Sequence, residues 1–240
     1  MMFEYNGAKI NYQFVNRGNE RVTLLLHGWG CSGKIFEKFM KMFDDRSFLV
    51  VDFPPFGDSK SLPCSWTIFS YASMIISLCE HLNIKTVDIL GHSFGGRIAL
   101  ILSSLKCIDV HSCILVDSAG IKPKKSLKKA FKVAIYKLKK KMGKNVDDYG
   151  SNDYKSLPPC MRGVFTNIVN TNLQPYLKQI EAQTLIVWGD QDNETPLYMA
   201  KRLNKHIKNS KLEVLHGGHF VFLDSPLSFY SVVEKFWEAI

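Results

Sequence analysis

The sequence predicts an α/β fold built on a mostly parallel β-sheet, and three observations support this prediction. Short apolar segments alternate with apolar helical segments along most of the chain, an order typical of parallel strands covered by helices on both faces. Polar, glycine-containing turns follow several of the expected strands, where open α/β sheets place their ligand sites. The chain has 240 residues, 46% of them hydrophobic, so it can bury a full core as one domain with an insertion.

The first half of the chain supplies the expected elements in order. Asn6-Gly7 is a strong hairpin turn signal, so residues 3–14 are expected to form an antiparallel hairpin. Apolar and β-branched runs then predict strands, and runs of good helix formers predict helices. The strands are expected at 22–26, 48–52, 86–90 and 112–116, and the helices at 67–82 and 96–105.

The second half resumes this order after an interruption. Strands are expected at 184–188 and 211–215, and a last helix at 229–239. Residues 119–183 carry no strand signal and look helical, which indicates an insertion into the α/β core. The expected organisation is therefore a first core segment at 1–118, a helical insertion at 119–183 and a second core segment at 184–240.

The pentapeptide Gly91-His92-Ser93-Phe94-Gly95 lies between an expected strand and an expected helix. This is the G-x-S-x-G pattern in its strand–turn–helix context, which places a serine on a sharp, strained turn. The hydroxyl of Ser93 would stand exposed at the carboxyl edge of the sheet, above a helix N-terminus that favours developing negative charge. The pattern predicts that Ser93 is a nucleophile.

Candidate partners of Ser93 follow the last two expected strands. Asp192 lies in the turn after 184–188, and His219 lies in the turn after 211–215. The order serine, acid, histidine is that of α/β-hydrolases. Asp117, at the end of the strand 112–116, and Asp190 remain alternatives for the acid. His216 remains an alternative for the base.

The turn His27-Gly28-Trp29-Gly30, which follows the expected strand 22–26, is a fourth motif. Together with the turns of Ser93, Asp192 and His219, it makes the chain resemble the α/β-hydrolase superfamily. The likeness covers nearly the whole chain and is strongest to the lidded bacterial esterases and carbon–carbon-bond hydrolases. It implies a mostly parallel sheet of about eight strands flanked by helices, with 119–183 as a helical cap inserted before the acid-bearing strand.

The resemblance also implies roles for individual residues. Ser93, Asp192 and His219 would form the catalytic triad, because His219 follows a glycine and precedes an aromatic residue as in the family. The backbone N–H groups of Trp29 and Phe94 would form the oxyanion hole. His27 would brace its turn rather than transfer protons.

Trp29, Arg97 and Phe220 are the expected substrate-binding residues. Arg97 lies one helical turn after Ser93 and could face the cleft. The run from Gly91 to Arg97 looks like the elbow of menaquinone-pathway synthases, where an arginine helps to bind carboxylate substrates. Pairing of Arg97 with a structural acid is the alternative. Phe220 departs from the carbon–carbon hydrolases, which usually carry a tryptophan after the histidine.

The expected function is that of a serine hydrolase cleaving a small, largely apolar ester through an acyl-enzyme. One alternative is a carbon–carbon-bond hydrolase or a menaquinone-pathway synthase-like lyase acting on a carboxylate. Another is a non-catalytic small-molecule receptor or signalling protein, because fold does not fix function.

The positive charge of the chain is concentrated in one segment. Lys122–Lys144 holds eleven lysines and no acid, so the net charge of +9 would be 9 − 11 = −2 without it. Its apolar positions predict one face of a cap helix: Leu127, Ala130, Phe131, Ala134, Ile135 and Leu138. The lysines then form either a solvated face or a contact with an anionic substrate or membrane surface.

Composition and motifs also argue against a disulfide framework, a metal or cofactor site, nucleic-acid binding and a membrane-spanning segment. The six cysteines show no C-x-x-C spacing or paired framework, and no metal-ligand cluster or phosphate-binding loop is present. We therefore expect no cofactor and no metal. No nucleic-acid-binding motif is present, so nucleic acid is not an expected partner. With no signal peptide and no long apolar run, a cytoplasmic location is expected. The oligomeric state stays open.

Overall fold

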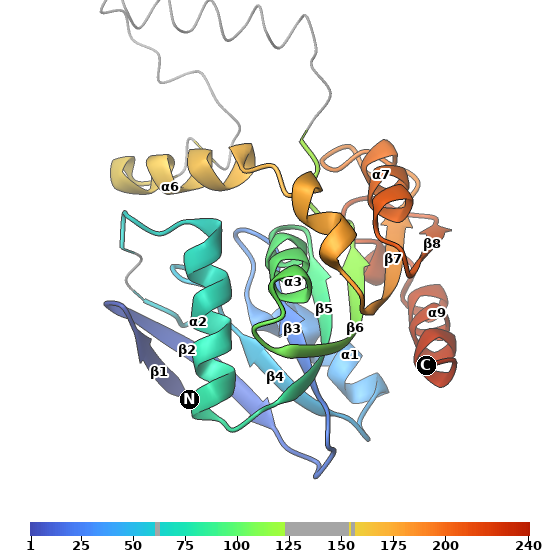
Figure 1. Cartoon of the computed structure of the whole chain (residues 1–240), viewed down its shortest axis with the longest axis horizontal. Coiled ribbons are helices and arrows are strands. Elements are labelled where there is room, and N and C mark those ends of the chain that lie inside the picture. Colours follow the sequence, from blue (N-terminus) through green and yellow to red (C-terminus); the bar gives the residue numbers. More distant parts are fainter. Residues whose placement is uncertain (61–62, 123–153, 155–156) are drawn as a thin grey trace, which may run out of the picture.

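A computed structural model describes residues 1–60, 63–122, 154 and 157–240, and within these ranges eight strands form one sheet (Figure 1). The strand order is β1-β2-β4-β3-β5-β6-β7-β8. The six strands from β4 to β8 in this order run parallel, whereas β1 and β2 are antiparallel at one edge. The expected fold, a mostly parallel sheet of about eight strands flanked by helices, is confirmed. The strands are β1 (Met2–Tyr5), β2 (Ala8–Val15), β3 (Val22–Leu26), β4 (Ser47–Val51), β5 (Thr86–His92), β6 (Asp109–Val116), β7 (Gln183–Gly189) and β8 (Ser210–Leu215).

The predicted N-terminal hairpin is present as β1 and β2. Tyr5 pairs with Ala8, which leaves Asn6 and Gly7 as a two-residue loop. Both loop residues have positive φ, 44° and 80°, and this is the backbone that a type I′ turn requires. The sequence signal therefore predicted the position of the turn correctly.

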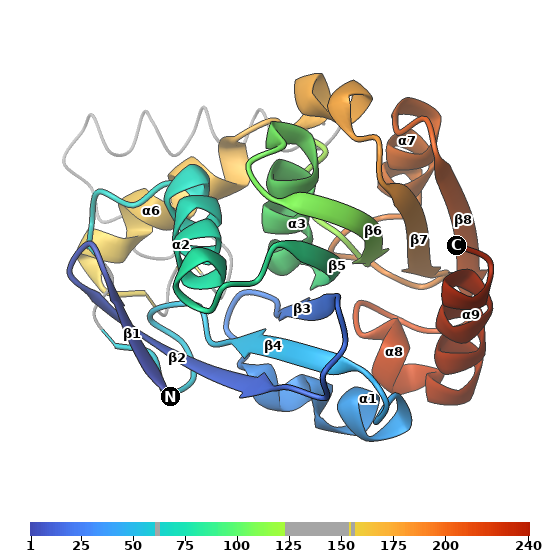
Figure 2. The ribbon, with the colours of Figure 1, turned by 60° about the horizontal axis from the view of Figure 1, so that its bottom comes forward.

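Helices cover both faces of the sheet (Figure 2). Leu24 and Leu26 of β3 point to the face that α2, α3 and α7 cover, whereas Leu25 points to the face covered by α1, α8 and α9. This alternation is the period-2 geometry of a strand that is buried on both sides. The helices are η1 (Gly33–Phe36), α1 (Glu37–Met42), α2 (Ile68–His81), α3 (Phe94–Leu105), α6 (Pro159–Asn170), η2 (Gln174–Gln179), α7 (Tyr198–His206), α8 (Val221–Asp224) and α9 (Pro226–Glu238).

The described part of the predicted cap is helical. It contains α6 and η2, and no strand lies in residues 119–122, 154 or 157–182. Phe165 of α6 packs edge-on against Trp29, with ring centroids 5.1 Å apart. Because Trp29 follows the carboxyl end of β3, α6 lies over the edge of the sheet where Ser93 is found. The boundaries 119–183 stay a prediction.

Candidate active site

The turn that carries Ser93 has the geometry of a nucleophile elbow. Strand β5 extends to His92 and α3 begins at Phe94, two residues earlier than the sequence predicted, so Ser93 alone makes the turn. Ser93 has φ 50° and ψ −109°, a region that non-glycine residues rarely adopt. A methyl group at Gly91 would lie 2.7 Å from the carbonyl oxygen of Gly95, and one at Gly95 would collide with the carbonyl of Leu26. Both positions therefore require glycine.

Ser93, His219 and Asp192 lie together at the carboxyl ends of β5, β8 and β7. Nε2 of His219 is 2.9 Å from Oγ of Ser93, and Nδ1 of His219 is 2.8 Å from Oδ2 of Asp192. The three residues come from turns more than 20 positions apart in the chain, and the parallel strands bring those turns to one edge. The arrangement allows a proton to pass from the hydroxyl to the imidazole.

The surroundings of Asp192 keep its carboxylate ionised and fixed. Oδ1 accepts the N–H groups of Glu194 and Thr195, and Oδ2 accepts the hydroxyl of Thr195 at 2.6 Å. Burial opposes ionisation, but the hydrogen bonds from His219 and Thr195 outweigh it and lower the pKa of Asp192. Burial likewise acts to lower the pKa of His219, yet the hydrogen bond and charge of Asp192 raise it above the ordinary value. Asp192 therefore stabilises the protonated imidazole.

The alternative acids bind other groups. The carboxylate of Asp117 accepts the N–H groups of Gly189 at 2.8 Å and Val221 at 3.1 Å, and burial raises its pKa to about 7. It thus ties the end of β7 to the start of α8. Asp190 accepts the N–H of Gly217 and lies 3.3 Å from Nδ1 of His216, at the exposed rim. The structure brings neither carboxylate into contact with His219.

The turn after β3 is braced by a buried histidine. Nε2 of His27 accepts the N–H of Phe53 at 2.8 Å, so Nδ1 carries the proton and donates to the carbonyl of Gly28 at 2.7 Å. Burial lowers the pKa of His27 to about 4, which keeps it neutral. This is the bracing role that the resemblance implied.

The two predicted oxyanion donors, the backbone N–H groups of Trp29 and Phe94, lie on neighbouring elements. Their rings are in edge contact, with centroids 5.3 Å apart. Among the turn, loop and cap hydrogen bonds of the described residues, neither N–H donates to a backbone carbonyl. The oxyanion role of the two amides stays a prediction.

His92 occupies a variable position of the G-x-S-x-G pattern, yet it contacts His219 directly. It is fully buried, and its Nε2–H donates to the carbonyl oxygen of His219 at 2.7 Å. Its ring packs against the rings of His219, Phe220 and Phe222, and burial lowers its pKa to about 3. His92 therefore holds the His219 turn against the elbow.

In the ranges that the structure describes, Arg97 binds backbone carbonyls and forms no ion pair with an acid. Its guanidinium is buried and donates to the carbonyls of Thr171 at 2.9 Å and Val169 at 3.2 Å, at the C-terminal end of α6. Burial lowers its pKa to about 10, so it is still charged at neutral pH. Among the described residues, the alternative in which Arg97 pairs with a structural acid is therefore not seen, and Arg97 holds the end of α6 instead. Phe220 packs beside His219, at a centroid distance of 5.6 Å.

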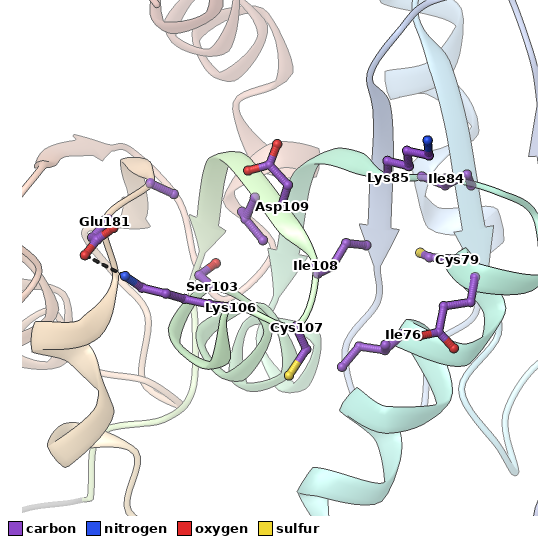
Figure 3. A pocket seen from close by; sticks show the side chains of 13 residues that line it. Ile76, Cys79, Ile84, Lys85, Ser103, Lys106, Cys107, Ile108, Asp109 and Glu181 are labelled. Carbon is purple, nitrogen blue, oxygen red and sulfur yellow. Dashed lines mark hydrogen bonds and ion pairs between the residues drawn. The ribbon is translucent and has the colours of Figure 1, made fainter.

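A pocket of about 490 Å³ lies away from these residues, at the other end of the sheet (Figure 3). Lys85 and Asp109 line it just before β5 and at the start of β6, and the ion pair of Lys106 with Glu181, 2.8 Å long, closes one side. None of the residues that line it belongs to the Ser93 site. The Ser93 site thus lies at the carboxyl ends of the strands, and this pocket lies at the amino ends of β5 and β6.

Three further expectations concern the lysine-rich segment, membrane-spanning helices and metal sites. The lysine-rich segment Lys122–Lys144 lies outside the described residues except for Lys122, as does its predicted apolar face. No helix in the described ranges has both the length and the apolar character needed to span a bilayer. The same ranges contain no group of three or more histidine, cysteine or acidic side chains that could hold a metal ion.

Comparison with known proteins assigns the chain to a family. The model of the alpha/beta hydrolase fold matches residues 22–159 and 149–226. An uncharacterized hydrolase, YugF of Bacillus subtilis, is 26% identical over 93% of this chain and 92% of its own. A proline iminopeptidase of Lactobacillus crispatus is 27% identical over 96% and 95%. An esterase from Exiguobacterium antarcticum shares the fold at a TM-score of 0.77, with 22% identity and 96% of each chain covered. The chain belongs to the α/β-hydrolase family.

Proposed function

We propose that the protein is a serine hydrolase that cleaves small, largely apolar carboxylic esters through an acyl-enzyme. One observation carries this proposal: the continuous hydrogen-bonded chain from Ser93 Oγ through His219 to Asp192. Hydrolases among the relatives support the general reaction class. The choice of an ester rests on the geometry of the site and on the expected apolar surroundings.

The proposed reaction has two steps. Oγ of Ser93 attacks the ester carbonyl while Nε2 of His219 takes its proton, and the N–H groups of Trp29 and Phe94 stabilise the oxyanion. When the carbon–oxygen bond to the alcohol breaks, His219 returns the proton to the leaving oxygen. A water molecule, deprotonated by His219, then attacks the acyl-enzyme and releases the acid and free Ser93.

The acyl side of the proposed site is aromatic. Trp29 contacts the rings of Phe56, Phe94 and Phe165 at centroid distances between 4.9 and 5.3 Å. Small-molecule sites are lined mostly by apolar and aromatic side chains, with few polar groups. This aromatic wall of Trp29, Phe56, Phe94 and Phe165 therefore favours apolar substrates. With Arg97 bound to the end of α6, no described observation favours a carboxylate substrate over an uncharged ester.

A panel of p-nitrophenyl esters of increasing chain length tests the proposal. We expect turnover on the order of 1–10³ s⁻¹ for the preferred ester, and loss of hydrolysis and of fluorophosphonate labelling in Ser93→Ala. The variant Ser118→Ala, on the following strand end, is a control that keeps the elbow serine. Equal labelling of the wild type and Ser93→Ala would refute the nucleophile. Very slow turnover together with ligand-induced stabilisation would favour a receptor.

A further inference from the structure

A second carboxylate lies against the catalytic face of the proposed base. Oε2 of Glu194 is 3.4 Å from Nε2 of His219, the same nitrogen that is 2.9 Å from Oγ of Ser93. The N–H of Glu194 donates to Oδ1 of Asp192 at 2.8 Å, which fixes its backbone beside the acid. The side chain of Glu194 is 68% exposed and that of Asp192 is fully buried. Glu194 therefore faces the open side of the imidazole.

This position borders the leaving group in the proposed reaction. Nε2 of His219 must reach the leaving oxygen to protonate it, so the alcohol of a bound ester lies next to Nε2. Glu194 Oε2, 3.4 Å from the same nitrogen, is then within contact range of the alcohol. The rings of Trp29 and Phe94, the two residues whose backbone N–H groups are the proposed oxyanion donors, contact each other at a centroid distance of 5.3 Å.

Within the described part of the chain, the carboxylate of Glu194 pairs with one group only. In the described ranges its one ion pair is with His219, which is neutral when it acts as the base. Two further exposed carboxylates near His219 have other partners: Asp190 contacts His216 and accepts the N–H of Gly217, and Asp224 accepts the N–H of Gly218. A cation on the substrate could therefore pair with Glu194 without displacing a lysine or arginine of the described residues.

We propose that Glu194 is a specificity-determining residue that favours esters whose alcohol carries a cation, such as an amino alcohol or a quaternary ammonium alcohol. The inference rests on the proposed function, since it assigns the leaving-group side of the same site. It adds a charge preference on the alcohol, whereas the acyl side stays apolar. Esters of anionic alcohols are disfavoured for the same reason.

Two isosteric esters test the charge preference. Butyrylcholine and 3,3-dimethylbutyl butyrate share the acyl group and the shape of the alcohol, and differ in the positive charge. We expect the wild type to show a kcat/KM ratio in favour of the cationic ester on the order of fivefold, the effect of a favourable exposed ion pair. The ratio should fall towards one in Glu194→Gln. Because the ratio is internal to each preparation, partial unfolding of a variant cancels.

Asp190→Asn is the matched control, because it removes a negative charge from the same rim without touching His219. It should keep the wild-type ratio. An unchanged ratio in Glu194→Gln, or an equal fall in Asp190→Asn, overturns the proposal while leaving the esterase function intact. If neither ester is hydrolysed in a Ser93-dependent way, the proposed function fails, and the charge preference fails with it.

A measurement without substrate checks the contact itself. The carboxylates of Asp192, Glu194 and Asp117 all act to raise the pKa of His219, and the neutral ring of His92 packs beside it. Glu194→Gln should therefore lower the pKa of His219 in an NMR titration of the imidazole, and Asp190→Asn should shift it less. A titration of His219 that is identical in the wild type and Glu194→Gln would show that the carboxylate does not reach Nε2.

Discussion

At the scale of single residues, two buried carboxylates beside the His219 turn differ in what they bind. Asp192 contacts the imidazole, whereas Asp117 accepts two backbone N–H groups. We expect Asp192→Asn to lower kcat about 10³- to 10⁴-fold, because the imidazole loses both its orientation and the negative charge that stabilises its protonated form. The pKa of His219 should fall, since Asp192 raises it. The acid limb of kcat/KM against pH then moves to lower pH.

Asp117→Asn is the matched variant for this prediction. An asparagine can accept only one of the N–H groups of Gly189 and Val221, so we expect lower stability with a much smaller loss of kcat. A pH–rate profile and a urea denaturation curve of each variant measure both effects. The opposite result, with turnover lost in Asp117→Asn and kept in Asp192→Asn, would make Asp117 the acid.

At the scale of elements, Arg97 joins the elbow helix α3 to the C-terminal end of α6. A cation is favoured there, because the last carbonyls of a helix have no intrahelical partners and carry partial negative charge. Phe165 of the same helix packs on Trp29. Arg97 thus positions the part of α6 that covers the aromatic wall, although it belongs to α3.

We expect Arg97→Met to loosen α6 without abolishing the chemistry. Amide hydrogen exchange in residues 159–170 should become faster, and KM for an apolar ester should rise more than kcat falls. Lys106→Met is the control, because its ion pair with Glu181 is exposed and contributes little. If Arg97→Met instead selectively lost activity on carboxylate-bearing substrates, Arg97 would be a substrate-binding residue as the sequence first suggested.

The sequence predicted elements better than contacts. Strands such as β3 are continuous apolar runs, and the Asn6-Gly7 turn is a local backbone signal, so both could be located without a structure. The Arg97 contact with Val169 and the His92 contact with His219 join residues 72 and 127 positions apart. Only the packed fold brings such pairs together. The contact of Glu194 with His219 also joins distant parts of the chain, so the residues next to Glu194 in the sequence predict a turn but not this contact.

At the scale of the whole molecule, the proposed catalytic residues and a stabilising ionic cluster lie at opposite ends of the sheet. The carboxyl ends hold Ser93, Asp192 and His219, whereas the amino ends hold a buried ionic cluster around Asp88 of β5. Asp88 accepts from the guanidinium of Arg46 and from the hydroxyl of Ser112 at 2.6 Å. Arg46 also stacks on Trp237 of α9, 3.8 Å from the ring centroid. The cluster therefore ties the last helix to the middle of the sheet.

This division predicts that stability and turnover respond to different substitutions. In Asp88→Asn, the half-buried Arg46 loses its charged partner, and breaking a buried ion pair in this way costs about 3–5 kcal/mol. We expect the free energy of unfolding to fall by an amount in this range, while kcat per folded molecule stays close to that of the wild type. Asp109→Asn at the same end, where the carboxylate is exposed, should change stability by less than about 0.5 kcal/mol. Chemical denaturation and active-site titration measure the two quantities separately. A large loss of kcat in folded Asp88→Asn would mean that the amino end of the sheet is coupled to the Ser93 site, because the substituted carboxylate makes none of that site's hydrogen bonds.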